Sequence, residues 1–374
     1  MKKTITIIIF LLILSLTIVI SRGIHNDNIS PLKQSYLPQS TVRIPVEDTY
    51  TLTPTISAVK TLTPAKELNQ AIPSPTPFHT STSTNTGLTV FKKNEKTIDI
   101  YFSMTDGKSS FIRFEKKSNG TWNLRGWYLS RDKQIPSQKA TLLAGSTSDW
   151  EYVLRVANKA NGSYQFSGGS HGNEILQSFK LFDTEKSTDF SLNIGQKVHV
   201  SKLKIIEDTH LTMSGSKKYA SVRRTYIISP SKIDLYTDYN FISDVYVGTS
   251  YVCMIPITKT YGRNIKFIDT NNVYKTPESG RTLSTNEFSN YIGKEKTLSV
   301  EMWGDHNPSY RCIVGIENEE MADKFQNELK VFYWDINTTT NKLYFSKYDN
   351  EDYTQISKGT KWSNHAFWEY QIKK

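Results

Sequence analysis

Tyr219-Ala-Ser-Val-Arg-Arg-Thr-Tyr-Ile-Ile-Ser-Pro-Ser-Lys-Ile-Asp-Leu-Tyr-Thr-Asp-Tyr-Asn-Phe-Ile242 is the stretch that decides the fold. Its two halves are rich in β-branched and aromatic residues, and between them Ser229-Pro-Ser-Lys232 has the composition of a turn. If the halves pair antiparallel across this turn, Ile228 lies opposite Ile233 and Val222 lies opposite Tyr239. The face that these residues share is mostly apolar. The stretch therefore predicts a β-hairpin with one face in a hydrophobic core.

The opposite face of this hairpin is polar. It places Arg223 across from Asp238 and Thr225 across from Tyr236, and Asn240 follows on the same face. Antiparallel sheets often leave one face in water, so this face is either solvated or the floor of a carbohydrate groove.

Most of the chain after Leu88 repeats the strand pattern of this hairpin. Asp106-Gly107 and Asn119-Gly120 separate the first runs as hairpin turns, and the only good helix candidate is Asn318–Leu329. Strands that follow one another through turns form antiparallel sheets packed face to face. Residues 88–374 are therefore predicted to be one all-β domain, a large antiparallel β-sandwich that is jelly-roll-like or built of wide curved sheets. The predicted strands are Thr97–Ser103, Ser110–Glu115, Thr121–Leu129, Val198–Ile206, Tyr219–Ile228, Ile233–Ile242, Tyr251–Thr258, Thr297–Met302 and Leu329–Trp334.

Residues 1–25 have the form of an export signal. Lys2 and Lys3 precede an apolar run from Ile5 to Ile20, and Arg22 follows it. This run fits a cleaved signal peptide or an uncleaved membrane anchor about equally. Residues 26–87 are rich in Thr, Ser and Pro and lack hydrophobic periodicity, which is typical of a disordered, extended linker. We therefore expect a secreted or cell-surface protein that meets the membrane only through its N-terminal segment.

The net charge is +10 at pH 7, of which +7 falls in residues 88–374. For an exported protein, this excess favours an acidic polysaccharide or a cell-wall polymer as partner, rather than nucleic acid. We expect a monomer. The two cysteines, Cys253 and Cys312, form either a disulfide or two unpaired buried thiols, and they lack the spacing of a metal site or a redox pair.

A second stretch, Tyr164-Gln-Phe-Ser-Gly-Gly-Ser-His-Gly-Asn-Glu174, combines three glycines with a single histidine and a carboxylate. Glycine permits backbone conformations and close approaches that other residues resist. The stretch therefore predicts a tight active-site loop that brings His171 and Glu174 to one point. The alternative is a glycine turn in which these two side chains make ordinary hydrogen bonds.

Within this loop, Gly168–Glu174 resembles the zinc-binding segment of metallocarboxypeptidases and aspartoacylases, which carries a His-x-x-Glu pair. The resemblance covers seven residues. It implies that His171 and Glu174 ligate zinc, together with a third histidine further along the chain. Those families place the motif between a strand and a long helix, whereas this chain continues into strands. A zinc-dependent hydrolase is thus one alternative function, and the candidates for the third ligand are His199, His210 and His306.

The preferred hypothesis is a polysaccharide lyase that acts on a uronic-acid-containing polymer without a metal or another cofactor. β-Elimination needs a group that neutralises the sugar carboxylate, a base for the neighbouring proton and an acid for the leaving oxygen. We expect His171 or Tyr236 to be the base and Tyr236 or Tyr164 to be the acid. Arg223 is the expected neutralising group, and Glu174 is expected to orient His171. The expected substrate-binding residues are Arg224, Asp238, Asn240, His210, Lys259, Tyr261, Arg263, Trp303 and His306.

Two further alternatives remain open. A glycoside hydrolase would pair Glu174 with a second carboxylate, for which Asp238 is the candidate. A non-catalytic carbohydrate-binding or adhesion protein on a stalk would use aromatic rings, because tryptophan and tyrosine grip sugars through their apolar faces. Trp303-Gly-Asp-His306 and Trp362-Ser-Asn-His365 have loop-like compositions and are the expected sugar contacts in that case.

Overall fold

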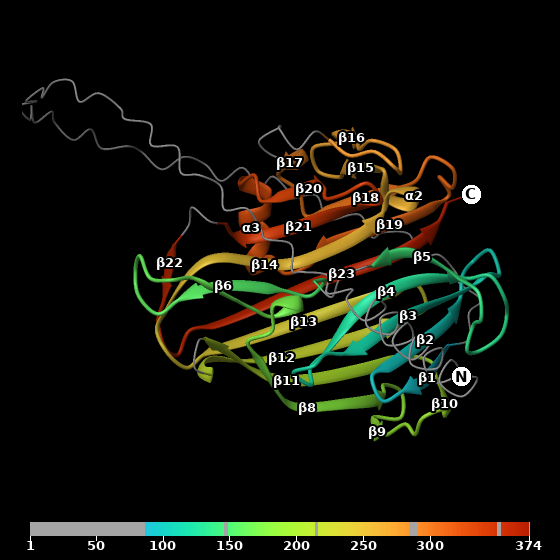
Figure 1. Cartoon of the computed structure of the whole chain (residues 1–374), viewed down its shortest axis with the longest axis horizontal. Helices are drawn as coiled ribbons and strands as arrows, with labels where there is room; N and C mark the ends of the chain where they lie inside the picture. Colours follow the sequence, from blue (N-terminus) through green and yellow to red (C-terminus); the bar gives the residue numbers. More distant parts are fainter. Residues whose placement is uncertain (1–86, 146–148, 214–215, 284–290, 350–352, 374) are drawn as a thin grey trace, which may run out of the picture. The chain divides into compact units, whose positions relative to one another are not determined.

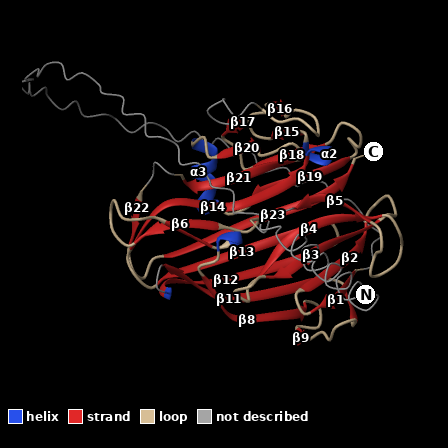
Figure 2. Ribbon diagram, viewed as in Figure 1, coloured by secondary structure: helices blue, strands red, loops and turns tan. Residues whose placement is uncertain are grey.

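The computed structural model describes residues 87–145, 149–213, 216–283, 291–349 and 353–373. The predicted export segment (1–25) and all of the predicted linker except Gly87 lie outside these ranges. Strands make up most of the described domain, and the helices are short (Figure 2). None of the helices among these residues has the length and apolar character of a transmembrane segment.

The strands form two antiparallel sheets, as the sequence predicted (Figure 1). Sheet A has thirteen strands: β1 (Leu88–Asn94), β2 (Thr97–Ser103), β3 (Ser109–Lys116), β4 (Trp122–Ser130), β5 (Ala140–Gly145), β6 (Val153–Ala157), β7 (Gln165–Ser167), β10 (Lys197–Val200), β14 (Val245–Thr258), β17 (Tyr291–Glu295), β20 (Val331–Asp335), β21 (Thr340–Tyr348) and β22 (Thr354–Ile356).

Sheet B has ten strands and contains the hairpin predicted over Tyr219–Ile242. Its strands are β8 (Glu174–Asp183), β9 (Thr188–Phe190), β11 (Leu203–Met213), β12 (Lys217–Ser229), β13 (Lys232–Phe241), β15 (Asn264–Phe267), β16 (Val273–Lys275), β18 (Ser299–Trp303), β19 (Tyr310–Ile316) and β23 (Lys361–Ile372).

The hairpin formed by β12 and β13 has the predicted register. Ile228 pairs with Ile233, Val222 with Tyr239, and Arg223 with Asp238. The apolar face of the hairpin is buried, whereas Arg223 and Asp238 are exposed on the other face. The alternation of residues along the two strands was therefore sufficient to place one face in the core and the other in water.

The inner faces of the two sheets meet in one large hydrophobic core. Val90, Ile100 and Phe345 from sheet A and Leu235 and Trp368 from sheet B are among its fully buried members. This packing confirms the predicted β-sandwich. We use "outer face" for the side of each sheet that is turned away from the other sheet.

Sheet A is nearly divided in two. Its two parts join between β5 and β14, where a single pair, Ala144 and Ile257, connects them. On that side of β4, the strand β5 pairs only with the segment from Gly126 to Ser130. The first residues of β4, starting at Trp122, therefore lack a strand neighbour there, and the backbone N–H groups at this position need other acceptors.

Three local expectations can be compared with the structure. The predicted helix is confirmed as α3 (Glu319–Asn327). The single strand expected over Val198–Ile206 is wrong, because the chain turns between β10 and β11, and the two strands belong to different sheets. Cys253 and Cys312 are free thiols buried in the core, on strands of different sheets.

Candidate functional site

The loop between β7 and β8 is built on glycines in the left-handed region. Gly168 has φ 83° and Gly169 has φ 53°, and a short 3₁₀ turn, η1 (Gly169–His171), follows. A side chain at Gly168 would meet the Tyr152 ring at 2.6 Å, and one at Gly169 would collide with the Asp149 carboxylate. Glycine is thus required twice here, both for conformation and for space. The tight loop that the sequence predicted is present.

This loop presents His171 on the outer side of sheet A. The imidazole is exposed, and its ring stacks on Phe166 of β7 with centroids 4.6 Å apart and planes 20° from parallel. Crowding by the surrounding protein lowers the pKa of His171 below its ordinary 6.5, although Asp149 opposes the shift. The side chain is therefore mainly neutral at pH 7 and can accept a proton.

Asp149 is the carboxylate held beside this loop. Its Oδ2 accepts a hydrogen bond from Ser170 Oγ at 3.0 Å and faces Lys342 Nζ of β21 at 3.3 Å. Burial acts to raise the pKa of Asp149, but Lys342 and Ser170 outweigh it and the pKa is lowered. A fixed negative charge thus lies next to a neutral histidine.

Aromatic rings pack next to His171, and Phe332 and Tyr344 among them are buried. Phe166 packs against a hydrophobic cluster on the outer face of sheet A, whose members come from β6, β14, β20 and β21 and are separate from the inner core. The ring centroids of Tyr251 and Tyr344 lie 4.8 Å apart. Phe332 stacks on Tyr344 with a centroid separation of 4.9 Å, and the centroid of Tyr291 lies 4.9 Å from that of Phe332. We call this set the aromatic floor, with members Phe166, Tyr251, Tyr291, Phe332, Trp334 and Tyr344.

Arg155 extends the aromatic floor toward Tyr164. Its guanidinium lies 4.9 Å from the Tyr164 ring centroid and 5.9 Å from that of Phe166. Tyr164 also contacts Tyr353 edge to face, with centroids 5.4 Å apart. Partial burial raises the pKa of Tyr164, so its hydroxyl stays protonated at neutral pH. Of the predicted catalytic residues, His171 stacks on Phe166, and Tyr164 is linked to Phe166 through Arg155, whose guanidinium lies over both rings.

Glu174 lies on the other side of the glycine loop, inside the sandwich. Its Oε1 accepts hydrogen bonds from Tyr152 at 2.6 Å and Thr209 at 2.8 Å, and it faces Arg224 at 3.3 Å. Among the described residues, the charged groups that shift the pKa of His171 are Asp149, Lys342 and Lys117. Glu174 therefore does not orient His171 as expected. The carboxylate next to His171 is Asp149.

Arg224 joins Glu174 to a second buried carboxylate, Glu207, at 2.8 Å. Arg224 and Glu207 are completely buried. A third buried carboxylate, Glu151, accepts hydrogen bonds from Tyr226 at 3.0 Å and from the Leu124 amide at 2.7 Å. We call Glu151, Glu174, Glu207 and Arg224 the buried ionic cluster.

The buried ionic cluster supplies hydrogen-bond acceptors at the gap in sheet A. Glu207 Oε1 accepts the Trp122 amide at 2.8 Å, and Glu151 accepts the Leu124 amide, so carboxylates satisfy N–H groups that lack a neighbouring strand. Burial raises the pKa of Glu207 to about 8, against the opposing effect of Arg224, and burial also raises that of Glu151. The cluster is therefore structural, and it supports the loop from beneath.

Lys117 lies between the glycine loop and the buried ionic cluster. Its ammonium donates a hydrogen bond to the Gly169 carbonyl in the loop. Burial lowers the pKa of Lys117, while Glu174 opposes the shift and Arg224 adds to it. The backbone of the 3₁₀ turn is thus held from the inside by a charge that also belongs to the surroundings of the buried ionic cluster.

The remaining predicted catalytic residues lie on the outer face of sheet B. Arg223 makes two hydrogen bonds to Asp208, at 2.7 and 3.1 Å, and Asp238 accepts one from Ser363 at 2.7 Å. Tyr236 stacks on His365 at 4.0 Å. His171 lies on the outer side of sheet A, so the sandwich separates it from Arg223 and Tyr236, and the predicted constellation is not assembled at one point.

The expected substrate-binding residues are dispersed. Arg224 is part of the buried ionic cluster, and Lys259 is buried in an ion pair with Asp335 at 2.6 Å. The others occupy three regions: Asn240 and His210 lie on β13 and β11 of sheet B, Tyr261 is in the core in α2 (Lys259–Gly262), and Arg263, Trp303 and His306 lie around the end of β18.

Two of these residues, Arg263 and Trp303, contact charged side chains nearby. The Arg263 guanidinium bonds Asp305 at 2.6 Å, and Arg311 lies over the Trp303 ring at 4.2 Å. The second loop-like segment, Trp362–His365, is not a loop, because it belongs to strand β23, where Trp362 is buried. The strand signal was the alternation of Trp362, Ala366, Trp368 and Tyr370 into the core, which extends beyond the four residues.

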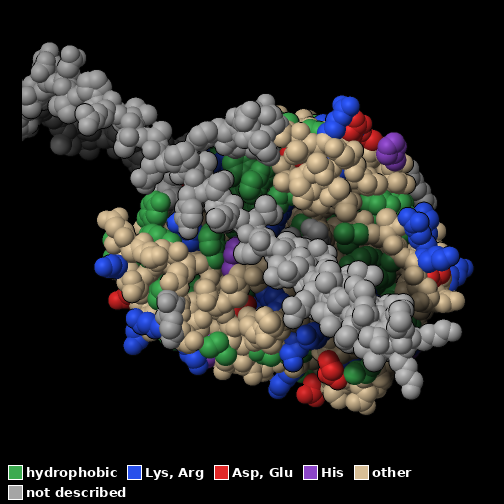
Figure 3. All heavy atoms as spheres, viewed as in Figure 1, with side chains coloured by type: hydrophobic (Ala, Val, Ile, Leu, Met, Phe, Trp, Pro, Cys, Tyr) green, Lys and Arg blue, Asp and Glu red, His purple; other side chains and the backbone are tan. Residues whose placement is uncertain are grey.

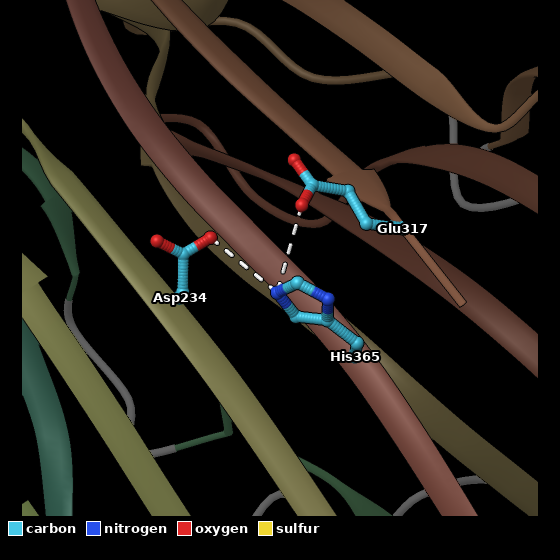
Figure 4. A group of neighbouring side chains, drawn as sticks. All are labelled: Asp234, Glu317 and His365. Atoms are coloured by element: carbon cyan, nitrogen blue, oxygen red, sulfur yellow. Dashed lines mark hydrogen bonds and ion pairs between the residues drawn. The ribbon is translucent and has the colours of Figure 1, made fainter.

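The described residues contain one group of three side chains able to share a metal ion. It consists of Asp234, Glu317 and His365 on the outer side of sheet B (Figure 4). Neither His171 nor Glu174 belongs to it, and neither do His199, His210 or His306. The zinc ligand set implied by the resemblance is therefore not formed, because Glu174 points into the sandwich while His171 points out of it.

Two cavities can be named among the described residues, and His171 lines neither of them. One of about 490 Å³ lies at the open edge of the sandwich, where Trp122 and Phe179 stack at 4.9 Å beside Phe190 and Lys92. The other, of about 410 Å³, is lined by His199, Tyr101 and Asp183 among others, and His199 bonds Thr89 Oγ1 at 2.9 Å.

Asp149, Lys342 and Arg155 were not predicted as site residues, and no local motif marks them. Arg224 is different, because the hairpin register already placed it on the same face as Val222 and Tyr226. An arginine on an apolar face predicts a buried ion pair rather than a ligand contact. The position of Arg224 in the strand alternation was therefore the available signal.

No protein-family model matches this sequence, and no curated protein matches it. Among solved structures, it is similar to an α-galactosidase from Lactobacillus brevis, with TM-score 0.42 and 11% identity over 75% of this chain and 40% of that chain. It is also similar to the GH36 α-galactosidase AgaB from Geobacillus stearothermophilus, with TM-score 0.39 and 10% identity over 76% of this chain and 41% of that chain. A third similar structure is a putative mutarotase (YeaD) from Salmonella typhimurium, with TM-score 0.37 and 6% identity over 78% of this chain and 96% of that chain. The chain thus spans about two fifths of the galactosidases. Similarities at this level do not assign a function.

Proposed function

We propose that the outer side of sheet A binds a carbohydrate polymer on the aromatic floor and that His171 is the acid–base group there. The observation that carries this proposal is the joining of an exposed, neutral histidine to an extended set of aromatic rings. Sugar rings stack on aromatic faces, and a histidine with a pKa below 6.5 is a competent base near neutral pH.

An acidic polymer is the proposed substrate class. The folded region has an excess of positive charge, and Arg155 lies over the rings of Tyr164 and Phe166, at the edge of the aromatic floor. A guanidinium can hold a carboxylate through two parallel hydrogen bonds. Positive side chains are visible at several separate places on the described part of the face in Figure 3. We assign carboxylate binding to Arg155 because its guanidinium lies beside the Tyr164 and Phe166 rings.

The proposed reaction is β-elimination at a uronic acid. His171 takes the proton from the carbon next to the carboxylate, the electron pair forms the C=C bond, and the C–O bond to the neighbouring sugar breaks. Tyr164 gives its proton to the leaving oxygen, since its raised pKa keeps it protonated. Arg155 neutralises the carboxylate, in place of the Arg223 expected from sequence. The extracytoplasmic location expected from residues 1–87 would give the site access to such polymers.

The test is ultraviolet absorbance of unsaturated sugar ends when the full-length protein is incubated with a panel of acidic polysaccharides. Wild type should produce such ends, and His171→Gln should lose at least about a hundredfold in rate, the usual contribution of a general base. His306→Gln, which changes an exposed histidine elsewhere, is the matched control and should keep full activity. Equal rates for wild type and His171→Gln would remove His171 from the chemistry.

A non-catalytic binding function is the second candidate. It rests on the aromatic floor alone, because stacking on a sugar ring needs no acid–base group. In that case the panel yields no unsaturated ends, yet polymer is retained by the protein. Retention should fall several-fold in Tyr291→Ala, on the aromatic floor, and should be unchanged in Tyr236→Ala, on the outer face of sheet B. These two tyrosines are similarly exposed, at 43% and 39%.

A further inference from the structure

Three side chains from three separate segments converge on the outer side of sheet B (Figure 4). Asp234 comes from β13, His365 comes from β23, and Glu317 directly follows β19. His365 Nε2 lies 3.4 Å from Asp234 Oδ1 and 3.6 Å from Glu317 Oε2. They are distant in sequence, and no local motif joins them.

The His365–Asp234 contact at 3.4 Å is a long hydrogen bond, and the His365–Glu317 separation of 3.6 Å is longer than a hydrogen bond. A charge-assisted N–H···O bond is about 2.7–2.9 Å long. Two ligand atoms on one tetrahedral zinc ion, with bonds of about 2.0–2.2 Å, are instead separated by about 3.3–3.6 Å. The two separations, 3.4 and 3.6 Å, lie in the second range. Imidazole nitrogen and carboxylate oxygen are also ligands that zinc accepts.

The backbone and a neighbouring ring hold this arrangement in place. Tyr236 stacks on the His365 ring at 4.0 Å, with planes 20° apart, which limits rotation of the imidazole. The Glu317 amide donates to the His365 carbonyl at 3.0 Å, so the two ligands are fixed relative to each other by main chain. Strand pairing places Tyr236 opposite His365, with Asp234 on the same face of β13. Geometry set by a sheet is more precise than geometry set by a loop.

Lys232 competes for the same carboxylates. Its ammonium lies 2.8 Å from Asp234 Oδ1 and 3.3 Å from Glu317 Oε1. It supplies one positive charge to two carboxylates, and its side chain also lies over the Phe367 ring at 5.0 Å. A divalent ion would neutralise both carboxylates, and the flexible lysine stem would let the ammonium move into water.

We propose that Asp234, Glu317 and His365 form a binding site for a divalent transition-metal ion of the zinc type, which displaces the Lys232 ammonium. Three protein ligands leave a fourth position open, the arrangement found where a metal also binds water or a ligand. The site lies on the opposite side of the sandwich from His171, and it stands independently of the proposed carbohydrate function.

The test is titration of the full-length protein, first stripped of metal with a chelator and dialysed, with zinc chloride in a calorimeter. Wild type should bind one equivalent, and His365→Ala should bind at least about tenfold more weakly. Glu317→Gln provides a second ligand variant at an exposed position, so it tests the site even if His365→Ala fails to fold. His306→Ala is the control and should bind as wild type does.

A substitution of Lys232 tests whether the metal ion displaces its ammonium group. Lys232→Met removes the competing cation while keeping an apolar stem against Phe367, so zinc should bind several-fold more tightly than in wild type. No stoichiometric binding by wild type would overturn the proposal, and so would equal affinities of wild type, His365→Ala and Glu317→Gln. Unchanged or weaker binding in Lys232→Met would refute displacement of the lysine.

Discussion

The two sides of the glycine loop differ in how their charges are arranged. On the outer side, His171 is exposed and the charge of Asp149 is balanced by Lys342, so a proton can move without removing support from the fold. On the inner side, Glu174 is buried among Tyr152, Thr209 and Arg224. Two ionisable residues that are three positions apart therefore have unlike roles. Access to solvent decides which of them is available for chemistry.

The largest effect is expected from removing the central cation of the buried ionic cluster. Arg224→Met leaves Glu174 and Glu207 without their partner, and breaking a buried ion pair costs about 3–5 kcal/mol in the free energy of unfolding. Arg223→Met is the matched control one residue away, because its ion pair with Asp208 is largely exposed and worth about 0–1 kcal/mol. Urea denaturation of both variants measures the difference. Similar losses would contradict the contrast between the two sides.

A smaller effect is expected in the loop itself. Gly169→Ala adds a methyl group against Asp149 in a left-handed conformation, which should cost about 1–3 kcal/mol and lower any activity that depends on His171. Gly172→Ala shares the positive φ but adds its methyl group to open space, so its cost of about 1–3 kcal/mol is conformational alone and lacks the clash with Asp149. Thermal unfolding, read beside the polysaccharide assay, compares them. A larger cost at Gly172 would show that packing on Asp149 is unimportant.

The last effect depends on pH. The pKa of Glu207 is about 8 in the folded protein, against an ordinary value of 4.5, so the folded state holds this proton more tightly. Its contribution to stability is complete below pH 4.5 and is lost as pH rises toward 8. Glu207→Gln removes this dependence while keeping an acceptor for the Trp122 amide. Its melting temperature should therefore fall less steeply than that of wild type between pH 5 and 8.

The reference for that measurement is Asp149, whose pKa is lowered rather than raised. Asp149→Asn should remove stability that is present above its ordinary pKa, near 3.8, and lost at lower pH. The two substitutions should thus change the pH profile in different windows. Identical profiles for wild type and Glu207→Gln across pH 5–8 would mean that Glu207 is ionised in the folded protein.

Local pattern was enough to predict the sheet architecture and part of the site. Alternation around Ser229–Lys232 set the hairpin register, and the glycines at 168, 169 and 172 marked the loop that presents His171. The partners of His171 could not be predicted in the same way. Asp149 and Lys342 are distant in sequence from each other, and only the packing of β21 beside β14 brings Lys342 to the loop.

The sequence by itself determined the β-sandwich, the turn positions and the residues that alternate into the core, because strand periodicity and turn chemistry act between near neighbours. Only the tertiary structure decided that Glu174 turns inward to Arg224 while His171 turns outward, and that Arg223 and Tyr236 lie across the sandwich from His171. The side to which a loop residue points depends on the backbone reversal at Gly172 and Asn173, both with positive φ, and on which carboxylates the gap in sheet A requires.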